Sequence, residues 1–217
     1  MRTHRRYWAW YRRHYDAIWD SPATEAWAVW VAEQVGGPVV VDIGCGTGLA
    51  SQALRSDGRK VLGVDSVPTM VWAALEQDRC TAALEADALR LPLASASVDG
   101  VLLANVLHVV AHPELVLREA RRVVRPGGRI VVCWPHDDIH PRTVLHRDIR
   151  SGRPVREALW AHALRILVGI PGSAAGVRRH RRSALLAAVE AVMSTEGVLV
   201  RADFDVVEVL AVRPRAG

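Results

Sequence analysis

The chain has 217 residues, of which 50% are hydrophobic and 24% charged, and it carries a formal net charge of +5. This length and this hydrophobic fraction predict a folded chain with a sizeable core and exclude an intrinsically disordered protein. Because Lys60 is the only lysine, the positive charge is almost entirely arginine, which favours solvated helix faces over a lysine-rich surface for nucleic acid.

The cysteines and the lengths of the apolar segments indicate in which cellular compartment the protein is expected. Three cysteines lack a CxxC spacing, and each lies in or beside an expected strand: Cys45, Cys80 and Cys133. This pattern favours reduced, buried thiols over a disulfide framework or a zinc site. No apolar segment reaches the roughly 18 residues that a membrane span needs, and the N-terminus lacks the apolar stretch of a signal peptide. We therefore expect a cytoplasmic protein with no membrane partner.

Helix and strand patterns alternate along most of the chain. Ser21 and Pro22 form a typical helix start, and Gly36-Gly37 ends that helix. Because the strand segments are continuous runs of valine, isoleucine and leucine, we expect helices on both faces of a doubly wound, mostly parallel sheet in an α/β fold. The expected strands are 38–43, 60–65, 81–87, 98–105 and 129–134, and the expected helices between them are 49–56, 68–77 and 113–124.

The alternation stops after residue 134. Residues 135–154 read as a loop or as short helices, and two helical patterns follow at 156–168 and 183–193. The segment 197–214 reads as one or two strands. There are no internal repeats and no low-complexity linkers, so we expect a single domain.

The stretch "VVVDIGCGTGLA" at 39–50 predicts a ligand-binding loop, because open parallel sheets bind ligands at the carboxyl ends of their strands. Glycine there lets a ligand approach the backbone or permits a positive φ. Asp42 lies two residues before the first of the three glycines, a position that is unfavourable beside a pyrophosphate. The acid therefore favours a ligand with cationic groups, such as S-adenosylmethionine, over NAD.

Two further acids follow later strands. Asp65 ends the second expected strand, where a carboxylate can accept two ribose hydroxyls in either class of cofactor. Asp87 and Ala88 follow the third strand, where a carboxylate and a backbone amide can bind the edge of an adenine. NAD-binding domains seldom carry this segment, so it also favours S-adenosylmethionine.

With these residues the chain resembles the class I S-adenosylmethionine-dependent methyltransferases, and within them the group of ubiquinone/menaquinone-type and natural-product small-molecule enzymes. Four ordered motifs within about 39–132 carry the resemblance: "VVDIGCGTG", "VLGVDSVPTM", "EADALRLPLASASVDGVLLANVLHVVAHPE" and "LREARRVVRPGGRIVV". The resemblance implies a Rossmann-like methyltransferase fold with a C-terminal edge strand or hairpin. The expected single domain, 1–217, divides into an N-terminal helical lid (1–37), a cofactor-binding core (38–134), an acceptor cap (135–197) and C-terminal strands (198–213).

The resemblance implies S-adenosyl-L-methionine as cofactor and S-adenosyl-L-homocysteine as its product. In the implied roles the glycines and Asp42 hold the methionine end, Asp65 holds the ribose, and Asp87 accepts from the adenine amino group. Met70 is equally consistent with a plain core methionine. The implied cofactor-binding residues are Asp42, Gly44, Cys45, Gly46, Gly48, Asp65, Ser66, Met70, Asp87, Ala88 and Asn105.

Methyl transfer needs alignment of donor and acceptor, exclusion of water and sometimes removal of a proton, so no catalytic triad is expected. His108 follows the fourth strand and has a suitable pKa range for a general base or an acceptor contact, although it can also pack under the lid. The run "HDDIH" (136–140) would suit a metal if it were helical, but the prolines on either side argue against a helix. We expect no metal and place His136 in contact with the acceptor.

Aromatic residues concentrate near the N-terminus. Tyr7, Tyr11, Tyr15 and Trp19 are spaced by four and therefore share one helical stripe. Packing of the lid onto the sheet explains most of this stripe. Tyr11 and Tyr15 are predicted to reach the carboxylate of the cofactor or the acceptor.

These features predict methyl transfer to an oxygen or nitrogen of a small molecule, in the biosynthesis of a secondary metabolite, by a monomer or homodimer. Three alternatives remain open. The arginine cluster at 178–182 would suit a methyltransferase of the tRNA wobble-uridine type, although nucleic acid is disfavoured because no aromatic residues are interleaved with it. The others are a C-methyltransferase of a quinone pathway and a non-catalytic cofactor-binding partner subunit.

Overall fold

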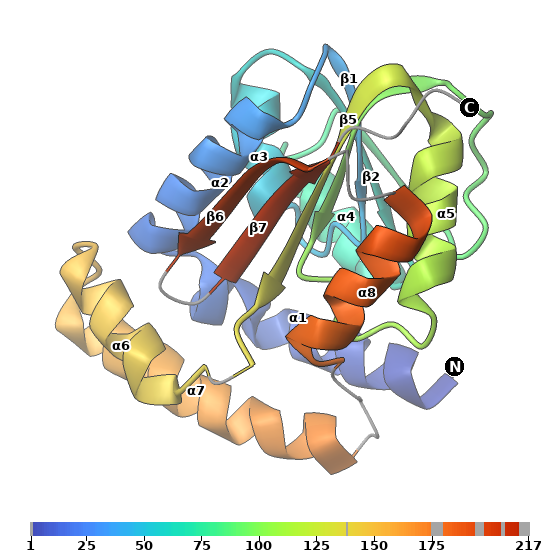
Figure 1. Ribbon diagram of the computed structural model, residues 1–217. Helices are drawn as coiled ribbons and strands as arrows, with labels where there is room; N and C mark the ends of the chain where they lie inside the picture. The colour runs from blue at the N-terminus through green and yellow to red at the C-terminus, as the bar shows by residue number, and fades with distance from the viewer. Residues whose placement is uncertain (1, 138, 175–179, 194–197, 205–206, 213–217) are drawn as a thin grey trace.

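A computed structural model describes residues 2–137, 139–174, 180–193, 198–204 and 207–212 (Figure 1). Its elements are α1 (Arg2–Trp19), α2 (Pro22–Gln34), β1 (Val39–Ile43), α3 (Leu49–Ser56), β2 (Lys60–Asp65), α4 (Pro68–Glu76), β3 (Ala82–Glu85), β4 (Val98–Ala104), α5 (Pro113–Val123), β5 (Val124–Pro135), α6 (Pro141–Arg150), α7 (Val155–Ala174), α8 (Arg182–Met193), β6 (Val198–Phe204) and β7 (Val207–Val212).

The strands form one seven-stranded sheet in the order β3-β2-β1-β4-β5-β7-β6. Strands β1 to β5 run parallel, whereas β7 runs antiparallel to β5 and β6 antiparallel to β7. This confirms the predicted α/β fold with a mostly parallel, doubly wound sheet and a C-terminal hairpin. The chain leaves β1 toward β2 on one side and returns through β4 on the other, so the connections diverge at the carboxyl ends of these two strands. Open sheets bind their ligands at such a point.

Helices cover both faces of the sheet, as the apolar strand sequences predict. Leu103 of β4 packs on one face with Leu117 of α5 and Leu185 of α8. Its neighbour Leu102 points to the other face, because successive strand residues alternate, and joins the cluster that contains Val31 of α2 and Leu54 of α3. Figure 1 shows α5 and α8 together on one side of the sheet and α2 and α3 on the opposite side.

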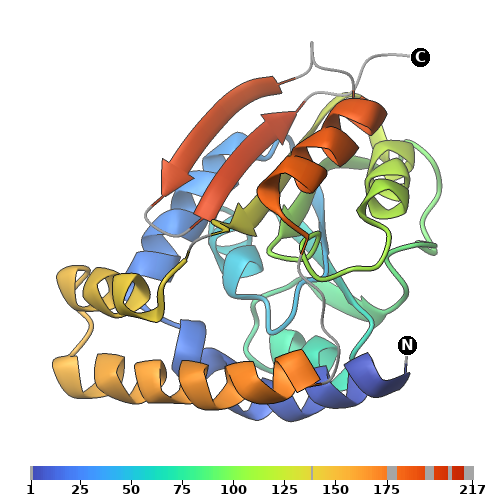
Figure 2. The ribbon, with the colours of Figure 1, turned by 60° about the horizontal axis from the view of Figure 1, so that its bottom comes forward.

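Three helices lie beyond the carboxyl ends of the parallel strands. The arrowhead of β5 points toward α1, α6 and α7 in Figure 1, and Figure 2 shows α7 lying alongside α1. Tyr11 and Ile18 of α1 pack there against Leu164 and Val168 of α7. None of the helices in the described ranges combines the length and hydropathy that crossing a bilayer requires.

Helix α6 lies within 135–154, the segment for which the sequence predicts a loop or short helices. It begins after Pro135 and the "HDDIH" run, and the Nδ1 of His140 caps it by accepting from the backbone N–H of Arg142 at 3.2 Å. Pro141 occupies the first turn, where its missing N–H costs nothing. The proline that argued against a helix through 136–140 therefore starts one.

Buried Asp148 joins α1, α6 and α7. Its carboxylate accepts from Arg147 at 2.9 Å, from Arg153 at 3.3 Å and from Arg165 at 2.6 Å. Arg153 and Arg165 also donate to the backbone carbonyl of Ile18, in the last turn of α1. Burial alone raises the pKa of Asp148, but the hydrogen bonds from Arg165 and Arg147 outweigh it and hold this pKa below its usual value.

Asp148→Asn removes the negative charge and leaves three largely buried arginines without it. Because uncompensated buried charge is costly, we expect the free energy of unfolding to fall by about 3–5 kcal/mol. Urea denaturation followed by circular dichroism measures this change. The matched control is Asp57→Asn, which breaks an exposed ion pair with Arg59 and should cost no more than about 1 kcal/mol. Equal losses in the two variants would show that the cluster contributes nothing special.

Candidate functional site

The loop Gly44–Gly48 leaves β1 at the carboxyl edge of the sheet. The backbone N–H groups of Gly44 and Cys45 both donate to the carbonyl of Val64, at 2.7 and 3.1 Å, and this fixes the loop against β2. Gly46 has φ +56, and a Cβ there would have the ring of Tyr15, 3.7 Å away, as its nearest neighbour. The three heavy atoms nearest to that position all belong to the phenol of Tyr15, and each lies at ordinary van der Waals distance.

Asp65 lies at the end of β2, beside this loop. One carboxylate oxygen accepts from the backbone N–H of Gly46 at 3.0 Å, and the other accepts from that of Val67 at 2.9 Å. Burial raises the pKa of Asp65, and these backbone hydrogen bonds partly oppose the rise. Each carboxylate oxygen has a second lone pair, so the side chain retains acceptor capacity for a ligand.

Asp42 is fully buried behind the loop. Its Oδ2 accepts from the hydroxyl of Ser51 at 2.6 Å, whereas its Oδ1 has no hydrogen-bond partner. Burial raises the pKa of Asp42 to about 7, and the nearby carboxylate of Asp65 adds to the rise. An orphaned oxygen of this kind fits a cationic or hydrogen-bond-donating ligand group, directly or through water.

The side chain of Cys45 turns away from the loop into the core. Its sulfur and that of Cys80 each lie 2.9 Å from the position that a Cβ on Gly63 would occupy. A side chain on Gly63 in β2 would therefore collide with both thiols, and a hydrogen bond with Cys80 is the main reason that the pKa of the Cys45 thiol is raised. Any contact of Cys45 with a ligand is through its backbone.

A buried arginine links α1 to the loop. The guanidinium of Arg79 donates to the carboxylate of Asp16 at 3.2 Å, to that of Asp20 at 2.9 Å and to the backbone carbonyl of Thr47 at 3.2 Å. The hydroxyl of Thr47 also donates to Asp16 at 2.6 Å. The Cβ of Arg79 fills the space beside Gly48, where a Cβ would come within 2.8 Å of it. These contacts hold the second half of α1 over the loop.

The remaining predicted cofactor residues lie along the same edge of the sheet. Met70 is buried in α4, whereas Ser66 and Asp87 are exposed and Ala88 is half-buried. Asp87 accepts from the backbone N–H of Leu89 at 3.0 Å. Asn105 has φ +57, and its side-chain oxygen is buried without a hydrogen-bond partner.

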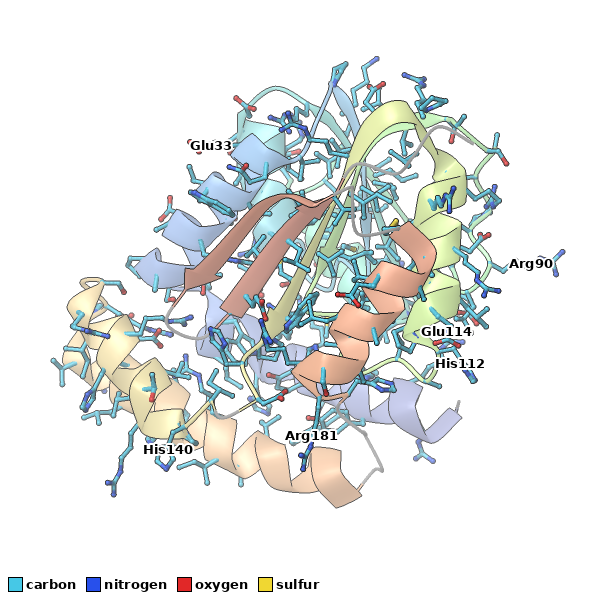
Figure 3. The ribbon with its side chains drawn as sticks, viewed as in Figure 1. Glu33, Arg90, His112, Glu114, His140 and Arg181 are labelled. Carbon is cyan, nitrogen blue, oxygen red and sulfur yellow. The ribbon has the colours of Figure 1, made fainter. Side chains whose placement is uncertain are left out.

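The connections after β4 and β5 meet the start of α8. The backbone N–H of His180 donates to the carbonyl of buried His108 at 2.9 Å, and the ring of His180 contacts the carbonyl of Val110 at 2.8 Å. Arg182 donates to fully buried Glu208 of β7, at 2.6 Å from its Nε, and its backbone N–H donates to Asp137. Figure 3 labels Arg181 just before α8, and its side chain is exposed.

The predicted acceptor residues occupy different places. The ring of Tyr15 lies against Gly46. Tyr11 instead packs between α1 and α7 and accepts a hydrogen bond from the indole of Trp19. His136 lies at the end of β5, half-buried, and His140 serves as the helix cap. Across the described ranges, no group of three histidine, cysteine or acidic side chains is arranged to hold a metal ion.

The sequence patterns did not predict the contacts that hold α1 over the glycine loop or those that join the start of α8 to β7. Nothing in the stretch "EQDRC" distinguishes Arg79 from an exposed arginine, and Asp16 and Asp20 read as polar residues of an amphipathic helix. Glu208 is a single acid within an apolar strand, which is a signal that could have been noticed, because a buried acid needs a partner.

Comparison with known proteins gives the family context. Residues 41–132 match the family described as "Methyltransferase domain". An uncharacterized methyltransferase of Mycobacterium tuberculosis (strain ATCC 25618 / H37Rv) is 39% identical over 126 residues, covering 54% of this chain and 49% of that protein. The demethylmenaquinone methyltransferase of Clavibacter sepedonicus is 35% identical over 121 residues, covering 54% of this chain and 47% of that protein. The chain thus spans about half the length of these curated relatives.

A solved structure from Thermotoga maritima matches over the whole fold. It is described as an S-adenosylmethionine-dependent methyltransferase, possibly a histamine N-methyltransferase. The TM-score is 0.65 at 17% sequence identity, and the match covers 99% of each chain. This likeness establishes the fold.

The pKa of Asp42 predicts a pH dependence of stability. The pKa of Asp42 rises from 3.8, the ordinary value of an aspartate in an unfolded chain, to about 7 in the folded protein. The folded state therefore retains the proton to higher pH than the unfolded state does. The stabilisation from Asp42 is therefore full below about pH 4 and is lost as the pH rises through about 7. Relative to Asp42→Asn, the free energy of unfolding should fall by about 4 kcal/mol over this range. Urea denaturation of both proteins across the range measures it, and a constant difference contradicts the prediction.

Proposed function

We propose that the chain, whose residues 41–132 match the methyltransferase-domain family, belongs to the class I S-adenosylmethionine-dependent methyltransferases and methylates an oxygen or nitrogen atom of a small molecule. We place this reaction in the biosynthesis of a secondary metabolite. The observation that carries the proposal is the site at the carboxyl edge of β1 and β2, where the open face of Gly46, the Asp65 carboxylate and the orphaned oxygen of Asp42 come together.

The residues of this site fit S-adenosyl-L-methionine in charge and in donor pattern. The carboxylate of Asp65 contributes to the raised pKa values of both Tyr15 and Asp42. Arg79, the buried cation beside the loop, is already shared among Asp16, Asp20 and Thr47. Such an acidic, partly desolvated site favours a ligand that brings positive charge. A pyrophosphate would instead meet uncompensated carboxylates.

Each predicted contact then has a physical role. Asp65 accepts from the ribose hydroxyls with the lone pairs that Gly46 and Val67 leave free, and Asp42 orders the amino end. The exposed carboxylate of Asp87 accepts from the adenine amino group, and Ala88 donates its backbone N–H. Gly44, Gly48 and the backbone of Cys45 shape the loop, and Asn105 lies near the reacting end. Ser66 and Met70 complete the ribose and adenine contacts.

When bound, the cofactor supplies a methyl group on a sulfonium, which is a good leaving group. The protein therefore has to align the acceptor, exclude water and, for a protonated acceptor, remove a proton. We assign the proton removal to His108, which the contact with His180 holds beside the connections after β4 and β5. Tyr15 and His136 are the proposed acceptor contacts, and Tyr11 supports Tyr15 through their edge-to-face ring contact.

Quinone C-methylation is the second candidate, because the relative from Clavibacter sepedonicus is named for that substrate class.

RNA methylation has weaker support than either of these reactions. Two of the arginines in the 178–182 cluster lie outside the described residues. The guanidinium of Arg182 donates two hydrogen bonds to the carboxylate of buried Glu208. In an RNA-binding surface of this protein, that guanidinium would point to solvent, where it could contact a phosphate.

An acceptor panel tests the function. The protein and S-adenosylmethionine are incubated with phenols, carboxylic acids, amines, a naphthoquinol or bulk tRNA, and formation of S-adenosylhomocysteine is measured. Turnover with a phenol, acid or amine supports the proposal, and turnover only with the naphthoquinol or tRNA replaces it. Binding without turnover would identify a non-catalytic subunit, and absence of binding refutes the cofactor assignment.

Asp65→Ala should abolish tight cofactor binding. Loss of two hydrogen bonds to a charged acceptor, each about 1.5–3 kcal/mol, raises the dissociation constant for S-adenosylmethionine at least about 100-fold. Isothermal titration calorimetry measures this dissociation constant. Thermal unfolding shows whether loss of the hydrogen bonds from Gly46 and Val67 to Asp65 destabilises the protein. Asp57→Ala is the control and should bind as the unchanged protein does. Unaltered affinity of Asp65→Ala would exclude the proposed ribose contact.

His108→Ala should lower kcat by about 10²–10⁴-fold with any acceptor that must lose a proton. The dissociation constant for S-adenosylmethionine should stay unchanged, and the rise of kcat with pH that reports the base should disappear. Rate measurements across pH on the acceptor found in the panel check both points. A variant with full activity would reduce His108 to a packing residue.

A further inference from the structure

Helix α7 presents an apolar face to solvent as well as to the protein. Its inner face packs through residues that are fully or nearly buried: Ala158, Ala161, Leu164 and Val168. Trp160 is 63% exposed and Leu167 60% exposed on the outer side. A solvent-facing helix normally carries polar residues on that side. The outer apolar residues are Val155, Leu159, Trp160, Ile166 and Leu167.

This face is not the ordinary scatter of exposed apolar residues. Ten large apolar side chains are exposed in the part of the chain that the structure describes, and half of them lie on α7. Their spacing of four and seven residues, as in Val155, Leu159 and Ile166, gathers them on one side of the helix. Contiguous apolar surface of this kind marks a binding surface.

Positive charge borders the apolar face. Helix α6 packs beside α7 and carries a hollow of about 430 Å³, lined by Arg142, Thr143, His146, Ile149 and Arg150. Arg156 is exposed in the first turn of α7. Across 141–168 the acids are Asp148 and Glu157, and Asp148 is buried against its arginines. Exposed Glu157 is outnumbered by exposed Arg142, Arg150 and Arg156, so the border of the apolar face carries a net positive charge.

We propose that the outer faces of α6 and α7 bind an anionic phospholipid surface. Figure 2 shows α7 stretched along the lower edge of the molecule, with α6 beside one end of it and the sheet above them. A helix that lies along a bilayer buries Trp, Leu and Ile at the headgroup boundary, while adjacent arginines contact anionic headgroups. The hollow on α6, with two arginines and a histidine, is suited to a lipid phosphate.

A second copy of the chain fits this surface less well. A two-fold interface places the same patch of both copies face to face, so the arginines that border α7 would meet like charges. The absence of an apolar segment long enough to span a bilayer is the reason why no membrane partner is expected from the sequence. An interfacial helix needs only one apolar face and a cationic border, so that expectation does not bear on this surface.

Vesicle sedimentation of the full chain tests the proposal without any methyl acceptor. The protein should sediment with vesicles of phosphatidylcholine and phosphatidylglycerol, and much less with phosphatidylcholine alone. The double variant Trp160→Ser/Leu167→Ser should lower the partition coefficient at least about tenfold. Arg142→Gln/Arg150→Gln should weaken binding to the anionic vesicles and reduce its dependence on salt.

The matched control is Trp72→Ser, which removes an equally exposed tryptophan, 61%, from α4. It should bind vesicles as the unchanged protein does. Circular dichroism verifies that all variants are folded, which their surface positions favour. No binding to anionic vesicles, or equal binding by Trp160→Ser/Leu167→Ser, overturns the proposal. A dimer in sedimentation equilibrium that this double variant dissociates, without vesicle binding, would assign the face to a second copy instead.

Discussion

The position of α1 over the carboxyl edge of the sheet depends on buried arginines that bind oxygen atoms at and just beyond its C-terminal turns. Arg79 holds Asp16 and Asp20 from the side of the loop after β1. Arg153 and Arg165 hold the carbonyls in the last turn of α1 from the side of α6 and α7. Because carbonyls at a helix C-terminus carry partial negative charge, cations are favourable there. The same short stretch of α1 thus connects the candidate site to the outer helices.

This arrangement explains an apparent contradiction in charge. The chain has an excess of arginine and a net charge of +5, yet the candidate site is acidic. Asp42 and Asp65 both have raised pKa values, and burial together with neighbouring acids also raises the pKa of Tyr15. Arg79, Arg153 and Arg165 form ion pairs with buried or partly buried acids that hold the helices together. Other arginines, such as Arg142 and Arg150, are exposed to solvent. The candidate site is therefore acidic within a protein that is cationic overall.

The sheet and the glycine loop after β1 could be predicted from the sequence because their signals are local. Apolar runs, Pro22 and Pro68 at helix starts, and the glycines after β1 reflect short-range sterics, and helix α3 coincides with the prediction at Leu49–Ser56. The contacts of Arg79 with Asp16 and Asp20, and those of Arg153 and Arg165 with the carbonyl of Ile18, could not be predicted, since these partners are distant in sequence. Tyr11 and Tyr15 share one helical stripe, but packing against α7 separates their surroundings.

The linkage of α1 to the loop has a kinetic consequence. The ring of Tyr15 stands over Gly46, and Arg79 keeps it there through Asp16 and Asp20. A ligand that lay along the glycines would be covered by this part of α1, and the ion pairs that hold the helix in place would slow its exchange. The ion pair between Arg79 and Asp20 is partly exposed and is therefore screened by salt. Ionic strength would act on the exchange of ligand more than on any step between bound reactants.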